Sequence, residues 1–256
     1  MLARRLAAWL VHLYTASGGV IGMFALFAAA EGRTEDAFLL LLLSMVVDAT
    51  DGLMARAVRV REVLPDFDGA MVDNVVDVLT FVWVPIFIMW SESLLPASAW
   101  IAVPVLAALY AYGQTNMKTT DAFFLGFPSY WNIVALYLFW LRPDAVLAVL
   151  LVVIPGILTL IPTRYLYASK NDILWKTTWT LGAIWFAMIV YMLTQADPAP
   201  ILIWLSLFYP AYYMIASFYV DWQVRQGTLH PRKVLRIWRP RFVEASPIEE
   251  SELEEA

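Results

Sequence analysis

Residues 46–80 read VVDATDGLMARAVRVREVLPDFDGAMVDNVVDVLT, and the main features of the architecture follow from them. Two apolar runs of helical length, residues 37–57 and 69–91, meet here across a short connection. A run of about 20 mostly apolar residues is long enough to cross a bilayer as a helix. Four carboxylates nevertheless lie within the two runs: Asp48, Asp51, Asp73 and Asp77. The sequence therefore predicts two neighbouring, antiparallel membrane helices that carry acidic side chains.

The composition excludes a soluble globular chain. Of the 256 residues, 61% are hydrophobic and only 15% are charged, which differs strongly from the balance of a soluble domain. The fold class is all-α, a polytopic membrane bundle of about eight transmembrane helices. The predicted spans are residues 14–30, 37–57, 69–91, 96–113, 123–141, 144–162, 175–195 and 200–220. Residues 1–12 place Arg4 and Arg5 opposite an apolar face, which predicts an amphipathic helix lying in the membrane interface.

Basic residues predict the orientation of the chain, because cytoplasmic connections carry an excess of Lys and Arg. With a cytoplasmic amino terminus, all of the 17 Lys and Arg except Arg33 and Arg142 fall on the inner side. Both termini are therefore expected in the cytoplasm. We expect a membrane domain over residues 1–220, a basic cytoplasmic arm over 221–243 and an acidic disordered tail over 244–256. The arm suits an anionic membrane surface, and we expect no nucleic acid there.

The four carboxylates form two stripes that can face each other. Asp48 and Asp51 are three residues apart, and Gly69, Asp73 and Asp77 repeat every four residues, so each set shares one helix face. An ionised carboxylate in a membrane helix costs roughly 2.5–3.5 kcal/mol on insertion scales, so a cation is needed to offset it. The chain has no cysteine and only 2 histidines, hence oxygen must supply the ligands. Oxygen ligands favour Mg²⁺, Mn²⁺ or Ca²⁺, and we expect two divalent ions here, Mn²⁺ or Mg²⁺.

The spacing of the acidic residues resembles the signature of the CDP-alcohol phosphotransferase family. The matching residues are Asp48, Asp51, Gly52, Ala55, Arg56, Gly69, Asp73 and Asp77. The spacer between Arg56 and Gly69, residues 57–68, is longer than in most of that family. It is similar to the spacer of the bacterial members that make phosphatidylcholine, which also have eight predicted spans.

The resemblance implies an enzyme that transfers the phosphatidyl group from CDP-diacylglycerol to choline, making phosphatidylcholine and releasing CMP. It implies that the four acidic residues hold the two ions and that Asp77 is the catalytic base. The residues that would form the nucleotide and diphosphate pocket are Asp48, Gly52, Ala55, Arg56 and Gly69. The likeness also implies a location in the bacterial inner membrane, with the active site on the cytoplasmic side. A homodimer follows from the family likeness alone.

Choline is a permanent cation, and proteins usually hold such groups between aromatic rings. Aromatic residues gather where the fifth predicted span begins, and two more lie on the third and fourth predicted spans. The candidates for a choline pocket are Trp83, Tyr112, Phe124, Phe127, Tyr130 and Trp131, with Asp121 as a source of complementary charge. For each ring alone, packing or a place in the interfacial belt is the alternative.

Three alternatives stay open at this stage. An anionic acceptor such as glycerol phosphate would bind basic residues, and Lys118, Arg164 and Lys170 are available; serine and inositol are further acceptors. Intramembrane carboxylates also line ion paths, so a cation transporter is the alternative of another class. It predicts acids spread across the bilayer depth, whereas here they gather near one end. A membrane scaffold without catalysis is the third alternative.

Overall fold

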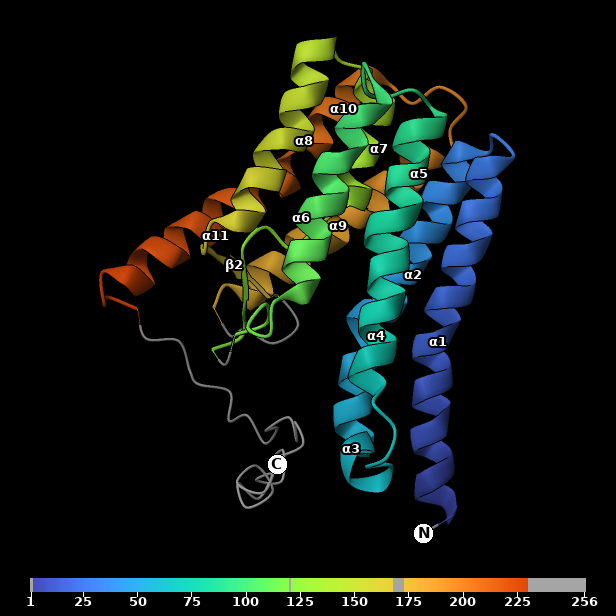
Figure 1. Ribbon diagram of the computed structural model, residues 1–256, viewed down its shortest axis with the longest axis vertical. Coiled ribbons are helices and arrows are strands. Elements are labelled where there is room, and N and C mark those ends of the chain that lie inside the picture. Colours follow the sequence, from blue (N-terminus) through green and yellow to red (C-terminus); the bar gives the residue numbers. More distant parts are fainter. Residues whose placement is uncertain (1, 120, 168–172, 230–256) are drawn as a thin grey trace, which may run out of the picture.

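The computed structural model describes residues 2–119, 121–167 and 173–229, and within these ranges the chain is a bundle of helices (Figure 1). The first half comprises α1 (Leu2–Ala30), α2 (Thr34–Val58), α3 (Val60–Val63), α4 (Gly69–Asp77), the π-helix η1 (Val78–Trp83), α5 (Val84–Ser91), the 3₁₀ helix η2 (Ser98–Ile101) and α6 (Ala102–Gly113). The second half comprises β1 (Phe123–Leu125), α7 (Trp131–Leu141), α8 (Ala145–Leu160), β2 (Arg164–Leu166), α9 (Trp175–Leu193), α10 (Pro200–Ser206) and α11 (Phe208–Arg225).

The bundle is apolar outside as well as inside, as expected of a protein surrounded by lipid. Large hydrophobic side chains are exposed along α8, among them Leu150, Ile154 and Ile157. In the described residues, four helical segments are long and apolar enough to cross a membrane: Leu2–Ala30, Thr34–Val58, Gly69–Ser91 and Pro200–Arg225. Shorter apolar helices cover Ser98–Gly113, Trp131–Leu141 and Ala145–Leu160. The all-α membrane fold is confirmed, and the count of about eight spans stays a prediction.

The structure corrects the start of the chain. In place of a separate helix over residues 1–12, α1 runs without a break from Leu2 to Ala30. The segment contains no proline that would interrupt it, and its alanines and leucines favour the helix. Ala8 and Val11 are buried in a small cluster with Val60 and Leu64. These contacts hold the first turns of α1 against the connection that follows α2.

The connection between α2 and α4 turns the chain back on itself. Arg59 ends α2 in the left-handed conformation, and α3 follows directly. Asp68 then caps α4, because its Oδ1 accepts hydrogen bonds from the backbone N–H groups of Ala70 at 3.0 Å and Met71 at 3.1 Å. The acidic helices are therefore antiparallel, as predicted, and both pack against α1. Figure 1 shows their lower parts beside α1, extending beyond the rest of the bundle.

The helix from Gly69 to Ser91 changes its winding in the middle. Asp77 is the last residue of α4, and the π-helix η1 begins at Val78. Pro85 lies just beyond η1, at the start of α5. Proline lacks a backbone N–H, and its ring crowds the carbonyl four residues earlier. The wider π winding accommodates Pro85. The π-helix begins immediately after Asp77, the residue expected to be the catalytic base, and π segments are common at functional sites.

The structure also corrects the span predicted over residues 123–141. Its first residues form β1, which pairs antiparallel with β2, and α7 begins only at Trp131. Gly126 has a φ of +82°, and a Cβ there would collide with the carbonyl oxygen of Thr159. Gly126 and the following Pro128 therefore end the strand and prevent a helix. The two-stranded sheet joins the loop before α7 to the loop after α8.

The opposite end of the bundle gathers the two basic residues predicted to lie outside. Arg142, which follows α7, donates to Glu92 Oε2 at 2.6 Å. Thr34, at the start of α2, also donates to the Glu92 carboxylate, and Arg33 precedes it. Arg33 and Arg142 thus lie at one end, and the acidic residues lie towards the other.

At the carboxyl terminus, α11 continues to Arg225. The domain boundary predicted at residue 220 therefore falls inside this helix, and Asp221 is buried. The basic arm predicted over 221–243 begins in that helix. Its residues from 230 onwards, and the acidic tail over 244–256, lie outside the described residues.

Candidate active site

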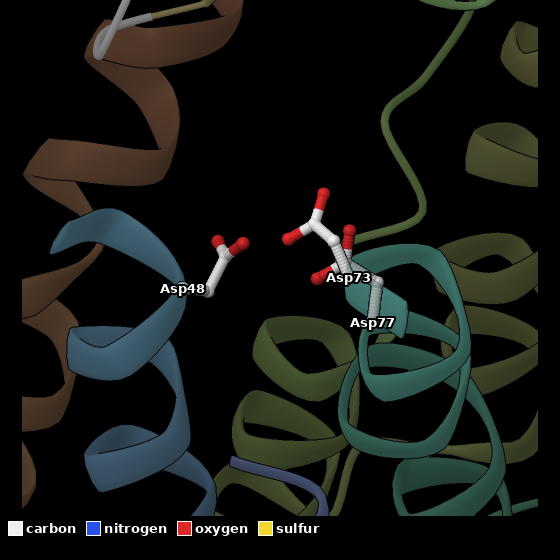
Figure 2. A group of neighbouring side chains, drawn as sticks. All are labelled: Asp48, Asp73 and Asp77. Carbon is white, nitrogen blue, oxygen red and sulfur yellow. The ribbon is translucent and has the colours of Figure 1, made fainter. Parts of the chain in front are cut away.

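Three of the four predicted carboxylates converge between α2 and α4. Asp48, Asp73 and Asp77 each offer an oxygen, and these oxygens lie within 4.8 Å of one another. Figure 2 shows Asp48 pointing from α2 towards the two side chains on α4. Asp77 is 8% exposed, and its buried Oδ1 has no hydrogen-bond partner among the described residues. Convergent carboxylates with an unpartnered oxygen fit an oxygen-binding divalent cation such as Mg²⁺ or Mn²⁺.

Asp51 lies outside this group of three. It is buried, and its Oδ2 accepts a hydrogen bond of 2.7 Å from the hydroxyl of Thr15 on α1. One residue earlier on both helices, the hydroxyls of Tyr14 and Thr50 are 2.8 Å apart. Thr15 is a functional candidate that sequence reasoning missed, because no local pattern shows that α1 reaches Asp51. A role for Asp51 as a metal ligand stays a prediction.

A lysine from the loop that follows α6 lies against the acidic group. Lys118 Nζ is 3.4 Å from Asp73 Oδ2 and 3.9 Å from Asp77 Oδ2. Burial acts to lower the pKa of Lys118, but Tyr167, Asp77 and Asp73 together raise it above its ordinary value. The ammonium therefore stays charged, and it neutralises part of the negative charge of the three carboxylates.

Besides Asp48, the residues predicted for the nucleotide pocket lie on α2 and α4, nearer to the connection between these helices than the three carboxylates are. Gly52 and Arg56 are adjacent on α2, since a Cβ at Gly52 would lie 3.2 Å from Arg56 Nη1. Arg56 is exposed, and Ala55 beside it is half-buried. A guanidinium folded over a glycine at the surface can turn to a ligand phosphate.

Gly69 makes room for a side chain of α1. A Cβ at Gly69 would collide with the imidazole of His12, reaching 2.9 Å from Nδ1. The His12 ring also packs against Phe67, with ring centroids 4.3 Å apart, and against Trp9 at 5.9 Å. His12 was not predicted as part of the site. In this structure, Gly69 is therefore required for the close approach of α1 to α4.

The aromatic candidates divide into an inner and an outer set. Phe127 contacts Tyr130 and Trp131, with ring centroids 6.4 Å and 5.7 Å apart. Phe124 instead stacks on Tyr167 at 4.3 Å, and Tyr167 is a residue that sequence reasoning missed. Trp83 is 40% exposed, which places it on the outer surface of the bundle.

Tyr112 on α6 is half-buried. The carboxylates of the acidic group affect the pKa of the Tyr167 hydroxyl. The pKa of Tyr167 is raised to about 12. Burial is the largest cause, Lys118 acts to lower the pKa, and Asp48, Asp73 and Asp77 act to raise it. The stack of Phe124 and Tyr167 therefore lies within electrostatic reach of the carboxylates and of Lys118.

The basic residues that an anionic acceptor would need are already paired. Arg164 Nη1 lies 3.3 Å from Asp221 Oδ1, and Arg164 Nε lies 3.5 Å from Asp121 Oδ2. Asp121 therefore pairs with Arg164, whereas it was predicted to complement choline. Lys118 pairs with Asp73 as described above, and Lys170 lies outside the described residues. Apart from Arg56, the described part of the chain thus offers little unpaired positive charge near the acidic group.

The fold and the site together define a helical membrane protein with a carboxylate centre towards one end of its bundle. No protein-family model matches the chain. The chain is 35% identical to a phosphatidylcholine synthase of Legionella pneumophila, over 83% of this chain and 88% of that protein. It is 38% identical to one of Mesorhizobium japonicum, over 74% and 72% of the two chains, and 34% identical to one of Pseudomonas aeruginosa, over 80% and 87%.

The chain belongs to the phosphatidylcholine synthase family, and the protein is an enzyme of that kind. The prediction of a transferase of phospholipid biosynthesis is thereby confirmed. Membership of the wider CDP-alcohol phosphotransferase family stays a prediction that rests on the eight-residue signature.

Proposed function

We propose that the protein transfers the phosphatidyl group from CDP-diacylglycerol to choline, making phosphatidylcholine and releasing CMP. The observation that carries this proposal is the convergence of Asp48, Asp73 and Asp77 in a chain of the phosphatidylcholine synthase family. A donor with two acyl chains requires a site that charged groups can enter while the chains remain in lipid. A carboxylate centre on membrane helices meets that requirement.

The acidic residues would hold two divalent ions, Mn²⁺ or Mg²⁺. Asp48, Asp51 and Asp73 are the proposed ligands of one ion, and Asp51, Asp73 and Asp77 those of the other. Bound ions would neutralise the diphosphate of the donor and the charge that develops on the departing CMP. Asp51 could join the ligand set if its side chain turned from Thr15, since it lies one helical turn from Asp48.

Asp77 is the proposed catalytic base. It would accept the proton of the choline hydroxyl while that oxygen bonds to the phosphorus attached to diacylglycerol, and the bond from this phosphorus to the CMP oxygen breaks. The buried, unpartnered Oδ1 of Asp77 supports this role, because no described donor competes for it. Orientation of the two substrates supplies much of the remaining acceleration.

The nucleotide would lie beside Asp48, Gly52, Ala55, Arg56 and Gly69, with Arg56 on a phosphate oxygen. The exposure of Arg56 over Gly52 supports this assignment. Choline would be held by the inner aromatic residues. The proposed set is Tyr112, Phe124, Phe127, Tyr130 and Trp131, to which the structure adds Tyr167 as the stacking partner of Phe124.

Choline is favoured over an anionic acceptor by the pairing of Arg164, which is shared between Asp121 and Asp221. An acceptor phosphate would have to break these ion pairs, whereas a cationic head group needs only aromatic faces and negative charge.

The proposed topology has eight spans with both termini in the cytoplasm of a bacterium and the acidic site on the inner face of the cytoplasmic membrane. The grouping of Arg33 and Arg142 at the end away from the acidic residues supports this orientation. We also propose that the enzyme forms a homodimer, for which the family likeness is the reason.

The test is product formation by the purified protein in detergent, with CDP-diacylglycerol and labelled choline, in Mn²⁺ or in chelator. We expect labelled phosphatidylcholine and CMP in Mn²⁺, and neither in chelator nor with Asp73→Ala. CMP release only with serine, inositol or glycerol phosphate would keep the reaction class and reject choline. If no acceptor gives product or CMP, and the protein carries ions across vesicle membranes, the proposal is wrong and the protein is a cation transporter.

A further inference from the structure

Lys118 is held at the acidic group by the backbone of its own loop. It forms a β-bridge with Phe124, and the N–H of Leu125 donates to the carbonyl of Met117 at 2.9 Å. The N–H of Thr119 donates to the carbonyl of Phe123, also at 2.9 Å. The backbone on both sides of Lys118 is thus fixed to β1, while its side chain is free to turn about four carbon–carbon bonds.

The charges around Lys118 do not allow it to stay in place when a divalent cation enters. Its ammonium lies 3.4 Å from Asp73 and 3.9 Å from Asp77, two of the three carboxylates that could hold the ion. A divalent cation bound to the same oxygens would repel the ammonium at similar distances, and partial burial weakens screening by water. One of the two cations must therefore leave.

We propose that Lys118 is a displaceable counterion of the metal site. Its ammonium neutralises Asp73 and Asp77 while metal is absent, and it moves away from them when metal and the donor diphosphate bind. This inference rests on the proposed function, since it presumes that the acidic group holds a metal ion. Lys118 acts on the charge of the site in this account, and no proton transfer or bond of the reaction is assigned to it.

The displacement couples the metal to the donor. Metal alone must separate Lys118 from the carboxylates, so its affinity is weakened. The diphosphate brings negative charge that can pair with both the metal and the displaced ammonium, so the donor restores the affinity. Without metal, the ammonium of Lys118 neutralises part of the charge of the three carboxylates. With the donor present, metal and donor strengthen the binding of each other.

The first test is Mn²⁺ titration, followed by electron paramagnetic resonance, of the purified full chain without substrates. Lys118→Met should bind Mn²⁺ at least tenfold more tightly than the unaltered protein. Lys118→Arg, which keeps the charge, should stay within twofold, as should Lys176→Met, which removes an exposed lysine beside the Trp175 ring. CDP-diacylglycerol should strengthen Mn²⁺ binding in the unaltered protein and much less in Lys118→Met.

The second test needs no substitution and so does not depend on the folding of a variant. Acetylation of Lys118 by an amine-reactive reagent, read by peptide mass spectrometry, should rise at least fivefold when saturating Mn²⁺ without donor replaces chelator. Lys176 serves as the internal reference. Equal Mn²⁺ affinity with and without the Lys118 charge, or unchanged acetylation, would overturn the counterion role alone. A protein that binds no Mn²⁺ at all would overturn the metal site of the proposed function as well.

Discussion

Thr15 on α1 donates a hydrogen bond of 2.7 Å to Asp51 on α2, and both side chains are buried. This bond joins the first helix, which carries no acidic residue of the signature, to the helix that carries the first two. The contact between Tyr14 and Thr50 reinforces it. The orientation of Asp51 therefore depends on α1.

Replacing Thr15 by valine should destabilise the protein by about 1–3 kcal/mol, because a buried carboxylate oxygen loses its donor. Valine has nearly the same shape, so packing is preserved. Equilibrium unfolding in mixed micelles measures the change. Thr15→Ser keeps the hydroxyl and should stay close to the unaltered protein. A valine variant as stable as the serine variant would show that the bond does not contribute.

Gly69→Ala should destabilise the packing of α1 against α4, because the added methyl group collides with the His12 imidazole. Overpacking of this kind typically costs about 1–3 kcal/mol. The double variant with His12→Ala removes the obstacle and should recover part of the loss. Gly113→Ala is the matched control, since a Cβ there meets nothing within 4 Å. If the two alanine variants unfold alike, the close approach of His12 does not constrain Gly69.

Asp77→Asn should lower the rate of choline transfer by at least about 100-fold, as expected for loss of a general base. The amide has the same shape but does not accept the hydroxyl proton. Binding of CMP should be largely kept, which calorimetry on the purified variant can establish. Full activity of this variant would remove Asp77 from the mechanism.

Tyr167→Leu should raise the KM for choline by about tenfold, because loss of a cation–π contact of 1–2 kcal/mol corresponds to that factor. The KM for CDP-diacylglycerol should change little. Trp83→Leu removes an aromatic ring that is 40% exposed on the outside of the bundle, and it should leave both constants within twofold. A raised KM for choline in Trp83→Leu, with an unchanged KM for choline in Tyr167→Leu, would place the choline pocket on the outer face and exclude Tyr167.

The sequence predicted the membrane class and the pairing of the acidic helices because both depend on local patterns. Apolar length identifies a membrane helix, and the four-residue repeat of Gly69, Asp73 and Asp77 identifies one helix face. The short connection then makes α2 and α4 neighbours. These features need no knowledge of the rest of the chain, and Asp48, Asp73 and Asp77 accordingly meet as expected.

The features that sequence reasoning missed depend on contacts between distant segments. Lys118 reaches Asp73 because its loop folds back on β1. Tyr167 meets Phe124 because β1 pairs with β2, and these three-residue strands are too short to show an alternating pattern. One local signal was present in the predicted span over 123–141, where Gly126 and Pro128 interrupt the apolar run. Those two residues could have predicted that the helix begins later.

The π-helix after Asp77 sets the direction in which two of the carboxylates face. A π-helix closes its hydrogen bonds over five residues in place of four, so the six residues of η1 shift the phase of α4 relative to α5. Buried residues such as Ile88 and Met89 fix α5 in the core. If the same six residues wound as an α-helix, α4 would rotate relative to α5 by about 100°, which would turn Asp73 and Asp77 away from Asp48. The direction in which the acidic side chains point thus depends on the winding of an apolar segment that contains none of them.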